Sequence, residues 1–182
     1  MMSCDEKTER LLFNFADARA AKEWRPVNDG VMGGRSDGRF HITDAHTMEF
    51  FGTISLENNG GFASVRSVPR TLDLAANDTI VLRVRGDGRE YSLNLYLPDR
   101  RMAASYRAKL STAKERWTEI AVPMKEFVET SFGRVVPNAG PVDAAKVNAI
   151  GFMLSDKQSG PFRLEVDWIK VRSAADHPSI QD

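Results

Sequence analysis

The chain has 182 residues, of which 42% are hydrophobic and 27% charged, and its 25 basic residues balance 25 acidic ones. This length suits one domain that folds without a disulfide or metal staple. Zero net charge does not favour nucleic acid or an anionic membrane as a partner. Cys4 is the single cysteine, so no intrachain disulfide can form, which fits a reducing compartment.

The N-terminal residues and the short apolar runs bear on location. Residues 1–10, MMSCDEKTER, carry three acidic side chains and no apolar run, which argues against a signal peptide. The apolar runs further along are too short to span a bilayer. We therefore expect a cytoplasmic protein that is not inserted into a membrane.

The first predicted elements are a strand and one short helix. Residues 11–15 (LLFNF) predict an opening strand. Residues 16–24 are rich in alanine and carry charge pairs at helical spacing, which predicts about two helical turns. Asp17 can cap this helix by accepting a hydrogen bond from a free backbone N–H, and Pro26 ends it.

From Arg35 onward the hydrophobic period changes to two, which is typical of strands. Turn residues separate these strands and no helix lies between them, so we expect an all-β, antiparallel jelly-roll β-sandwich with one short N-terminal helix. The expected domain covers residues 11–172, with tails at 1–10 and 173–182 and a long surface loop at 131–146. Strands are predicted over residues 38–42, 48–55, 61–68, 79–85, 91–97, 104–110, 117–122, 147–154 and 162–171.

Two stretches are rich in glycine, WRPVNDGVMGGRS at 24–36 and NNGGFASVR at 58–66. A nucleotide-binding loop would need a Gly-Lys-Ser/Thr ending or a following helix, and neither is present. We expect Gly33 and Gly34 to adopt positive φ or to allow close contact with a neighbouring backbone. Asp29 is expected to bridge backbone N–H groups in an Asx-type turn. Arg66 is expected either to tie the two loops together or to act in binding.

No catalytic constellation is visible. The three histidines, His41, His46 and His177, are scattered, and neither Gly-x-Ser-x-Gly nor His-Glu-x-x-His occurs. Cys4 lies too near the terminus to be a good candidate nucleophile. We therefore expect no catalytic residues and no enzymatic activity.

The sequence leaves one kind of metal site open, a structural Ca²⁺ site. No EF-hand spacing occurs, so no metal ligands and no cofactor are assigned. A structural Ca²⁺ stays open, because four carboxylates lie near turns: Asp29, Asp87, Asp156 and Asp167.

A polar strand face is the second candidate site. If the aliphatic residues of 79–85 and 91–97 face the core, Arg83, Arg85, Asn94 and Tyr96 face away from it. Trp117 lies opposite the core-facing residues of its own strand, and an outward tryptophan beside arginine and amide groups could stack on a sugar. The alternative is that the loop at 131–146 covers Trp117.

Six blocks follow one another along the chain: VNDGVMGGRS, FFGTISLENNGGFASVR, LRVRGDGREYSLNLY, SYRAKL, RWTEIAVPMKEF and IGFMLSDKQSGPFRLEVDWI. Together they resemble the complex I intermediate-associated protein 30 family. The resemblance covers 11–172 and implies a galactose-binding-like jelly-roll sandwich. It also implies that mitochondrial members are assembly factors for respiratory complex I, that related domains occur in bacteria, and that no catalytic residues carry over. The motif residues that transfer are Asp29, Gly30, Gly33, Gly34, Arg35, Ser36, Asn58, Asn59, Gly60, Gly61 and Arg66.

Three functions are therefore carried forward. The first is a non-catalytic assembly-factor or chaperone-like domain for a respiratory or other multi-subunit complex, acting through protein partners. The second is a carbohydrate-binding module, and the third is an enzyme on a small polar substrate held between the glycine loops. The candidate ligand- or partner-binding residues are Asn28, Asp29, Gly30, Gly33, Gly34, Arg35, Ser36, Asn58, Asn59, Arg66, Arg83, Asn94, Tyr96 and Trp117.

Overall fold

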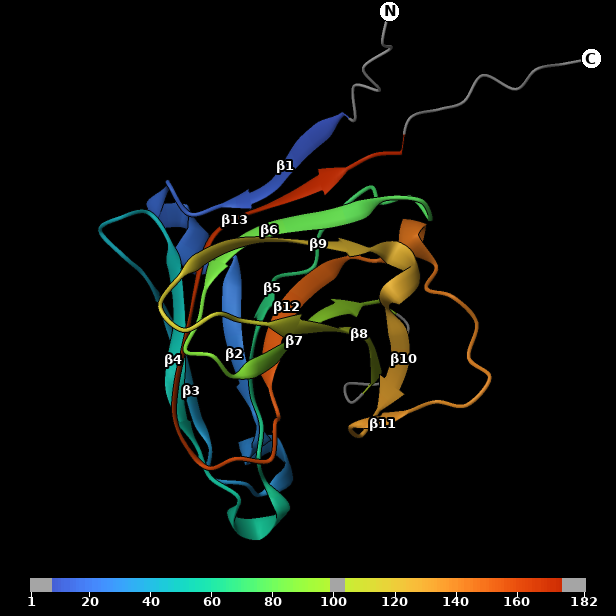
Figure 1. Ribbon diagram of the computed structural model, residues 1–182. Coiled ribbons are helices and arrows are strands. Elements are labelled where there is room, and N and C mark those ends of the chain that lie inside the picture. The colour runs from blue at the N-terminus through green and yellow to red at the C-terminus, as the bar shows by residue number, and fades with distance from the viewer. Residues whose placement is uncertain (1–7, 99–103, 175–182) are drawn as a thin grey trace, which may run out of the picture.

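The computed structural model describes residues 8–98 and 104–174. In these ranges the chain is all-β, as the period-two pattern predicts, and its strands form two antiparallel sheets (Figure 1). The strands are β1 (Glu9–Asn14), β2 (Trp24–Asn28), β3 (Asp37–Ile42), β4 (Met48–Ile54), β5 (Ala63–Ser67), β6 (Thr79–Arg85), β7 (Glu90–Tyr96), β8 (Ala104–Ser111), β9 (Trp117–Pro123), β10 (Val128–Ser131), β11 (Arg134–Val135), β12 (Ala149–Leu154) and β13 (Gly160–Arg172). The 3-10 turns are η1 (Ala18–Lys22), η2 (Asp29–Met32), η3 (Glu57–Asn59), η4 (Met124–Glu126) and η5 (Ala144–Lys146).

The two sheets differ in how they are assembled. The six-stranded sheet has the order β3-β4-β13-β6-β9, and β1 also pairs with β13. The seven-stranded sheet has the order β11-β10-β8-β7-β12-β5-β2. Strand β13 is long enough to pair with β4 through its first half and with β1 through its second half, while β6 lies on its other side. Apart from the consecutive pairs β3–β4, β7–β8 and β10–β11, neighbouring strands are distant in sequence, as expected of a jelly roll.

The core lies between the inner faces of the two sheets. Alternation along β6 and β7 sends the aliphatic side chains inward, where Leu82 and Leu93 are fully buried. Trp24 packs against Phe13 and Phe152, with ring centroids 5.1 Å and 6.2 Å away, and so connects β1, β2 and β12. Burying a side chain of this size contributes about 1.5–3 kcal/mol, so this cluster pins β2 to the sandwich.

The N-terminal helix is shorter and tighter than predicted. Asp17 caps it, since its Oδ1 accepts a hydrogen bond from the Arg19 N–H at 2.9 Å, but the helix is the 3-10 turn η1 and not two α-helical turns. Trp24 begins β2 instead of ending the helix, because its buried ring belongs to the core. Pro26 lies within β2, an edge strand where one missing N–H is tolerated.

Three strands were not predicted: β2, β10 and β11. The predicted loop at 131–146 contains β11 and the 3-10 turn η5. Strand β1 begins at Glu9, inside the predicted tail at 1–10. The remainder of the two predicted tails lies mostly outside the described residues.

Candidate functional site

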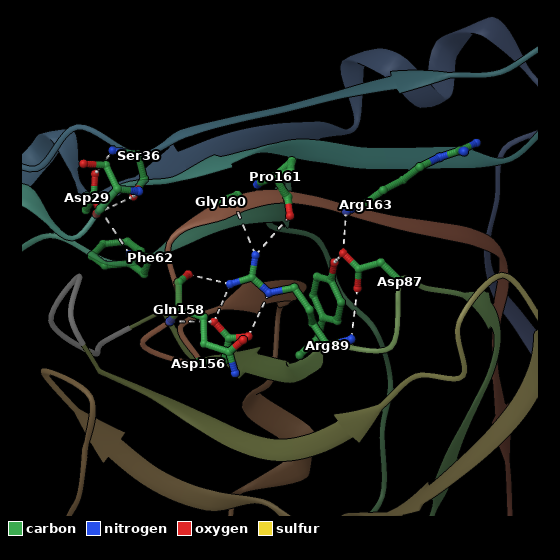
Figure 2. Close-up of polar contacts among 12 residues, drawn as sticks. Asp29, Ser36, Phe62, Asp87, Arg89, Asp156, Gln158, Gly160, Pro161 and Arg163 are labelled. Atoms are coloured by element: carbon green, nitrogen blue, oxygen red, sulfur yellow. Dashed lines mark hydrogen bonds and ion pairs between the residues drawn. The ribbon is translucent and has the colours of Figure 1, made fainter.

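The two glycine stretches meet at the carboxylate of Asp29. This side chain is fully buried. Its Oδ1 accepts a hydrogen bond from the Ser36 N–H at 2.9 Å, and its Oδ2 accepts from the Gly61 N–H at 2.7 Å and the Phe62 N–H at 3.2 Å (Figure 2). Burial alone would raise the pKa of Asp29, but the hydrogen bonds from Ser36, Gly61 and Phe62 outweigh it and hold the pKa below its usual value. The expected Asx-type turn is local, whereas the donors here are Ser36 and, from the other stretch, Gly61 and Phe62, so Asp29 bridges the two loops.

The glycines make this close approach feasible. A Cβ on Gly34 would lie 2.4 Å from Asp29 Cγ, and a Cβ on Gly60 would lie 2.6 Å from Asp29 Oδ2. Gly33 has φ of 87° and ends η2 in the left-handed region, which favours glycine. Gly30 has open space where a Cβ would lie. The loops therefore pack on one carboxylate, and the glycines of the two stretches line neither hollow described below.

The other candidates in these loops also make local contacts. Asn28 donates a hydrogen bond to the Gly38 carbonyl at 2.9 Å, and Arg35 forms an exposed ion pair with Glu57 at 3.2 Å. Asn58 and Asn59 have φ of 57° and 56°, which asparagine tolerates better than most residues. Arg66 packs on the ring of Tyr96, and no hydrogen bond or ion pair joins it to Asp29 within the described residues.

The carboxylates near turns hold strands together. Asp156 accepts two hydrogen bonds from Arg89, at 2.8 Å from Nε and 2.6 Å from Nη2, and Arg89 also donates to the Gln158 carbonyl at 2.6 Å (Figure 2). Asp87 accepts from the Arg163 N–H at 2.9 Å, and Asp167 pairs with Arg83. Within the described residues, no group of three or more His, Cys, Asp or Glu side chains is placed to hold a metal ion.

The predicted sugar platform is not assembled, because its residues lie on different sheets. Arg83 and Trp117 are on β6 and β9 of the six-stranded sheet, whereas Asn94 and Tyr96 are on β7 of the seven-stranded sheet. The guanidinium carbons of Arg83 and Arg85 lie 4.6 Å and 4.9 Å from the Trp117 ring centroid. These arginines cover the ring and are held by ion pairs to Asp167 and Glu165.

Three of the predicted residues come together on the outer face of the seven-stranded sheet. The Arg66 guanidinium carbon lies 4.3 Å from the Tyr96 ring centroid, and Asn94 Nδ2 donates a hydrogen bond to Tyr96 Oη at 3.1 Å. Asn94 is fully buried and Tyr96 nearly so. Burial raises the pKa of Tyr96 above its usual value, although Arg66 opposes the shift. The ring is therefore a neutral platform under a permanent cation.

Two further arginines belong to this face and were not predicted. Arg107 is the cross-strand partner of Asn94, and Arg25 is the cross-strand partner of Arg66. The period-two pattern of 104–110 places Arg107 on the polar face, so that signal was available. Arg25 lies in a strand that the sequence did not reveal. We call Arg25, Arg66, Asn94, Tyr96 and Arg107 the arginine face.

A hollow of about 160 Å³ opens beside the arginine face. Arg25, Arg66 and Tyr96 line it together with Asn148. A larger hollow of about 540 Å³ lies near Tyr106, Glu129 and Lys146. The described residues contain no helix long and apolar enough to cross a membrane.

The fold places the chain in a known class of sandwich domain. It superposes on a family 11 carbohydrate-binding module from a Clostridium thermocellum cellulase with a TM-score of 0.67 at 17% identity, covering 94% of this chain and 98% of the module. An agarase, AgWH50C, matches with a TM-score of 0.64 at 12% identity, covering 95% of this chain and 25% of the agarase. These likenesses define a galactose-binding-like jelly roll and nothing about ligands.

The sequence then defines the family. The sequence model of the protein family described as complex I intermediate-associated protein 30 matches residues 13–166, and the chain belongs to that family. The mouse protein called "Complex I intermediate-associated protein 30, mitochondrial" is 30% identical, over 89% of this chain and 56% of its own length. The Drosophila melanogaster protein of the same name is 25% identical, over 92% of this chain and 64% of its own length. This chain therefore spans little more than half the length of these relatives.

Proposed function

We propose that this protein is a non-catalytic assembly factor that acts through protein–protein contacts on respiratory complex I or another multi-subunit complex. The observation that carries the proposal is the family match over residues 13–166. The names of the relatives, which refer to intermediates of complex I, support it. Packing of the glycine loops around Asp29 also supports it, because both oxygens of that carboxylate already accept hydrogen bonds from backbone N–H groups.

The β10–β11 hairpin is the surface we propose for these contacts. Val128, Phe132 and Val135 are 47%, 66% and 64% exposed, which is unusual for large apolar side chains grouped on one short hairpin. Aromatic and aliphatic side chains at the centre of an interface supply much of its binding energy. Strand β11 is also the outermost strand of its sheet, so its free edge is open to a partner.

The test is to purify the tagged protein from its native cells and identify what comes with it by mass spectrometry. We expect subunits of a NADH:ubiquinone oxidoreductase or of another defined complex, and we expect less of the assembled complex on native gels when the gene is disrupted. The double variant Phe132→Ser, Val135→Ser should lose most of the recovered subunits. Leu56→Ser is the matched control, because Leu56 is 47% exposed outside this hairpin.

Unchanged amounts of every complex, together with recovery of no complex subunit, would refute the assembly role. The expected cytoplasmic location is part of the same proposal, although the curated relatives are named as mitochondrial. Cell fractionation with antibodies to the tag decides between the two compartments.

A further inference from the structure

Eight arginines of the described part of the chain pair with a carboxylate, whereas the arginines of the arginine face, like Arg10, Arg70, Arg116 and Arg134, do not. A guanidinium nitrogen lies within 2.6 Å of a carboxylate oxygen in each of Arg83, Arg85 and Arg89. The arginine face has three arginines, Arg25, Arg66 and Arg107. Within the described residues, no carboxylate lies within ion-pair distance of any of them.

The strand register concentrates these charges. Arg25 pairs with Arg66 across β2 and β5, and a single row continues through Gly151 to Asn94 and Arg107. Like charges directly opposite one another on a sheet repel. Burial lowers the pKa of Arg107, and repulsion by the nearby Arg66 lowers it further, although Tyr96 opposes the shift. The register therefore sets three cations without carboxylate partners in one row of the sheet.

Two of the arginine side chains, those of Arg66 and Arg107, are also held in position before any ligand arrives. Arg66 rests on the Tyr96 ring, and Gly151 lets that ring lie close, because a Cβ there would be 3.2 Å from Tyr96 Cε2. Arg107 Nε donates a hydrogen bond to Ser105 Oγ at 3.2 Å. Ordering a long side chain costs entropy, so prior positioning favours binding.

Unsatisfied polar atoms gather at the same place. Arg66 Nε and Asn94 Oδ1 are both buried without a hydrogen-bond partner, and Asn94 is fully buried. Buried polar groups in proteins are nearly always paired, and two of the five unpaired side-chain atoms of the described residues lie in this one row of the sheet. Arg66 Nε can only donate, and therefore calls for an acceptor.

We propose that the arginine face binds an oxyanion, a carboxylate or phosphate group, in the hollow lined by Arg25, Arg66 and Tyr96. Guanidinium groups match the planar, paired oxygens of these anions and form charge-assisted hydrogen bonds with them. The hollow of about 160 Å³ admits one such group on a small molecule or at the end of an acidic side chain. The proposal concerns the protein alone and does not depend on the assembly role.

The test is a calorimetric titration of the purified protein with inorganic phosphate and with glutarate, at ionic strength held constant with sodium chloride. We expect saturable binding that is weakened at least about tenfold in Arg66→Gln and in Arg25→Gln, since each variant loses a charged hydrogen-bond donor. Arg39→Gln is the control, because Arg39 is an exposed arginine of β3 paired with Asp37. It should bind like the wild type.

Each variant is melted without anion to establish that it folds. Arg66→Gln should melt at or above the wild-type temperature, because repulsion with Arg25 is relieved. If Arg66→Gln does not fold, Arg25→Gln carries the test, since Arg25 is exposed and can be replaced without disturbing the core. Absence of saturable binding, or equal binding by all four proteins, overturns the proposal.

A third arm identifies the source of the anion. A glutamate-containing hexapeptide is compared with glutarate under the same conditions. Tighter binding of the peptide, lost in Arg66→Gln, indicates that the oxyanion belongs to an acidic segment of a protein. Equal or weaker binding of the peptide indicates a free small molecule.

Discussion

Asp29 is the residue on which both glycine loops depend, because three backbone N–H groups from two segments meet at its carboxylate. We predict that Asp29→Asn lowers the free energy of unfolding by about 2–4 kcal/mol, because an amide nitrogen would replace one buried acceptor. Urea denaturation measures the loss. Asp17→Asn is the control: Asp17 is an exposed helix cap, and asparagine caps equally well, so that change should stay within about 0.5 kcal/mol.

The neighbouring glycines allow a second prediction at single positions. Gly34→Ala should cost about 1–3 kcal/mol, because its Cβ would lie 2.4 Å from Asp29 Cγ. Gly33→Ala should cost about 1–2 kcal/mol for a different reason, the positive φ of 87°. Gly30→Ala meets nothing within 4 Å and should be nearly neutral. Equal stability of all three variants in urea would show that the loops repack freely.

At the level of elements, the ion pair between Arg89 and Asp156 fastens the start of β7 to the turn before β13. The two side chains are only 14% and 10% exposed. Asp156→Asn leaves a buried arginine uncompensated, so we predict a loss of about 3 kcal/mol or more in the free energy of unfolding. Asp37→Asn breaks an exposed pair with Arg39 and should cost less than about 1 kcal/mol. Comparable losses in both variants would contradict the burial argument.

The β10–β11 hairpin carries a conformational cost at its tip. Phe132 has φ of 48° and Gly133 has φ of 75°, and asparagine is preferred over phenylalanine at such a turn position. We predict that Phe132→Asn raises the free energy of unfolding by about 0.5–1 kcal/mol while reducing recovery of partner subunits. Thermal melting and affinity purification on the same variant check both parts. A stabilised variant with full recovery would remove Phe132 from the proposed contact surface.

The sequence predicted most strands, because alternation is strong where one face of a strand is buried. Residues 79–85 are an example, since the predicted strand and β6 share the same bounds. Strand β2 was missed because Pro26 suggests a break, and β11 because two residues are too few to show a period.

The candidate site was harder to predict than the strands. Alternation shows that Arg83 and Asn94 both face away from the core, but it does not say that they belong to different sheets. That assignment depends on pairing between strands far apart in the chain, such as β12 with β5. For Asp29, the turn residues around it predict an acceptor of backbone N–H groups, but not that Gly61 and Phe62, which lie 32 and 33 residues along the chain, supply two of them.

For the whole molecule, the buried carboxylates predict how stability depends on pH. The pKa values of Asp29, Asp156 and Glu165 are all lowered by folding: burial opposes the shift, and hydrogen bonds and arginine partners outweigh it. A lowered folded-state pKa gives stability that is present above the unfolded value and lost as pH falls through the folded value. The unfolding free energy should therefore be level near neutrality and fall below the ordinary values of 3.8 and 4.5.

Urea titrations from pH 7 down to pH 2.5 measure this dependence. The fall should be shallower in Asp156→Asn, which has one fewer carboxylate to protonate. Stability that is flat through pH 3 would contradict the assignment of these three groups.

The pairing of β1 with β13 has a consequence for protein engineering. Figure 1 shows β1 and the end of β13 side by side, and the Ser173 N–H donates a hydrogen bond to the Thr8 carbonyl at 3.0 Å. Thr8 and Ser173, where the chain enters and leaves the sandwich, are therefore adjacent. The domain can be spliced into a surface loop of a host protein, or its two ends joined by a few glycines to make a circular permutant, without stretching any strand of the core.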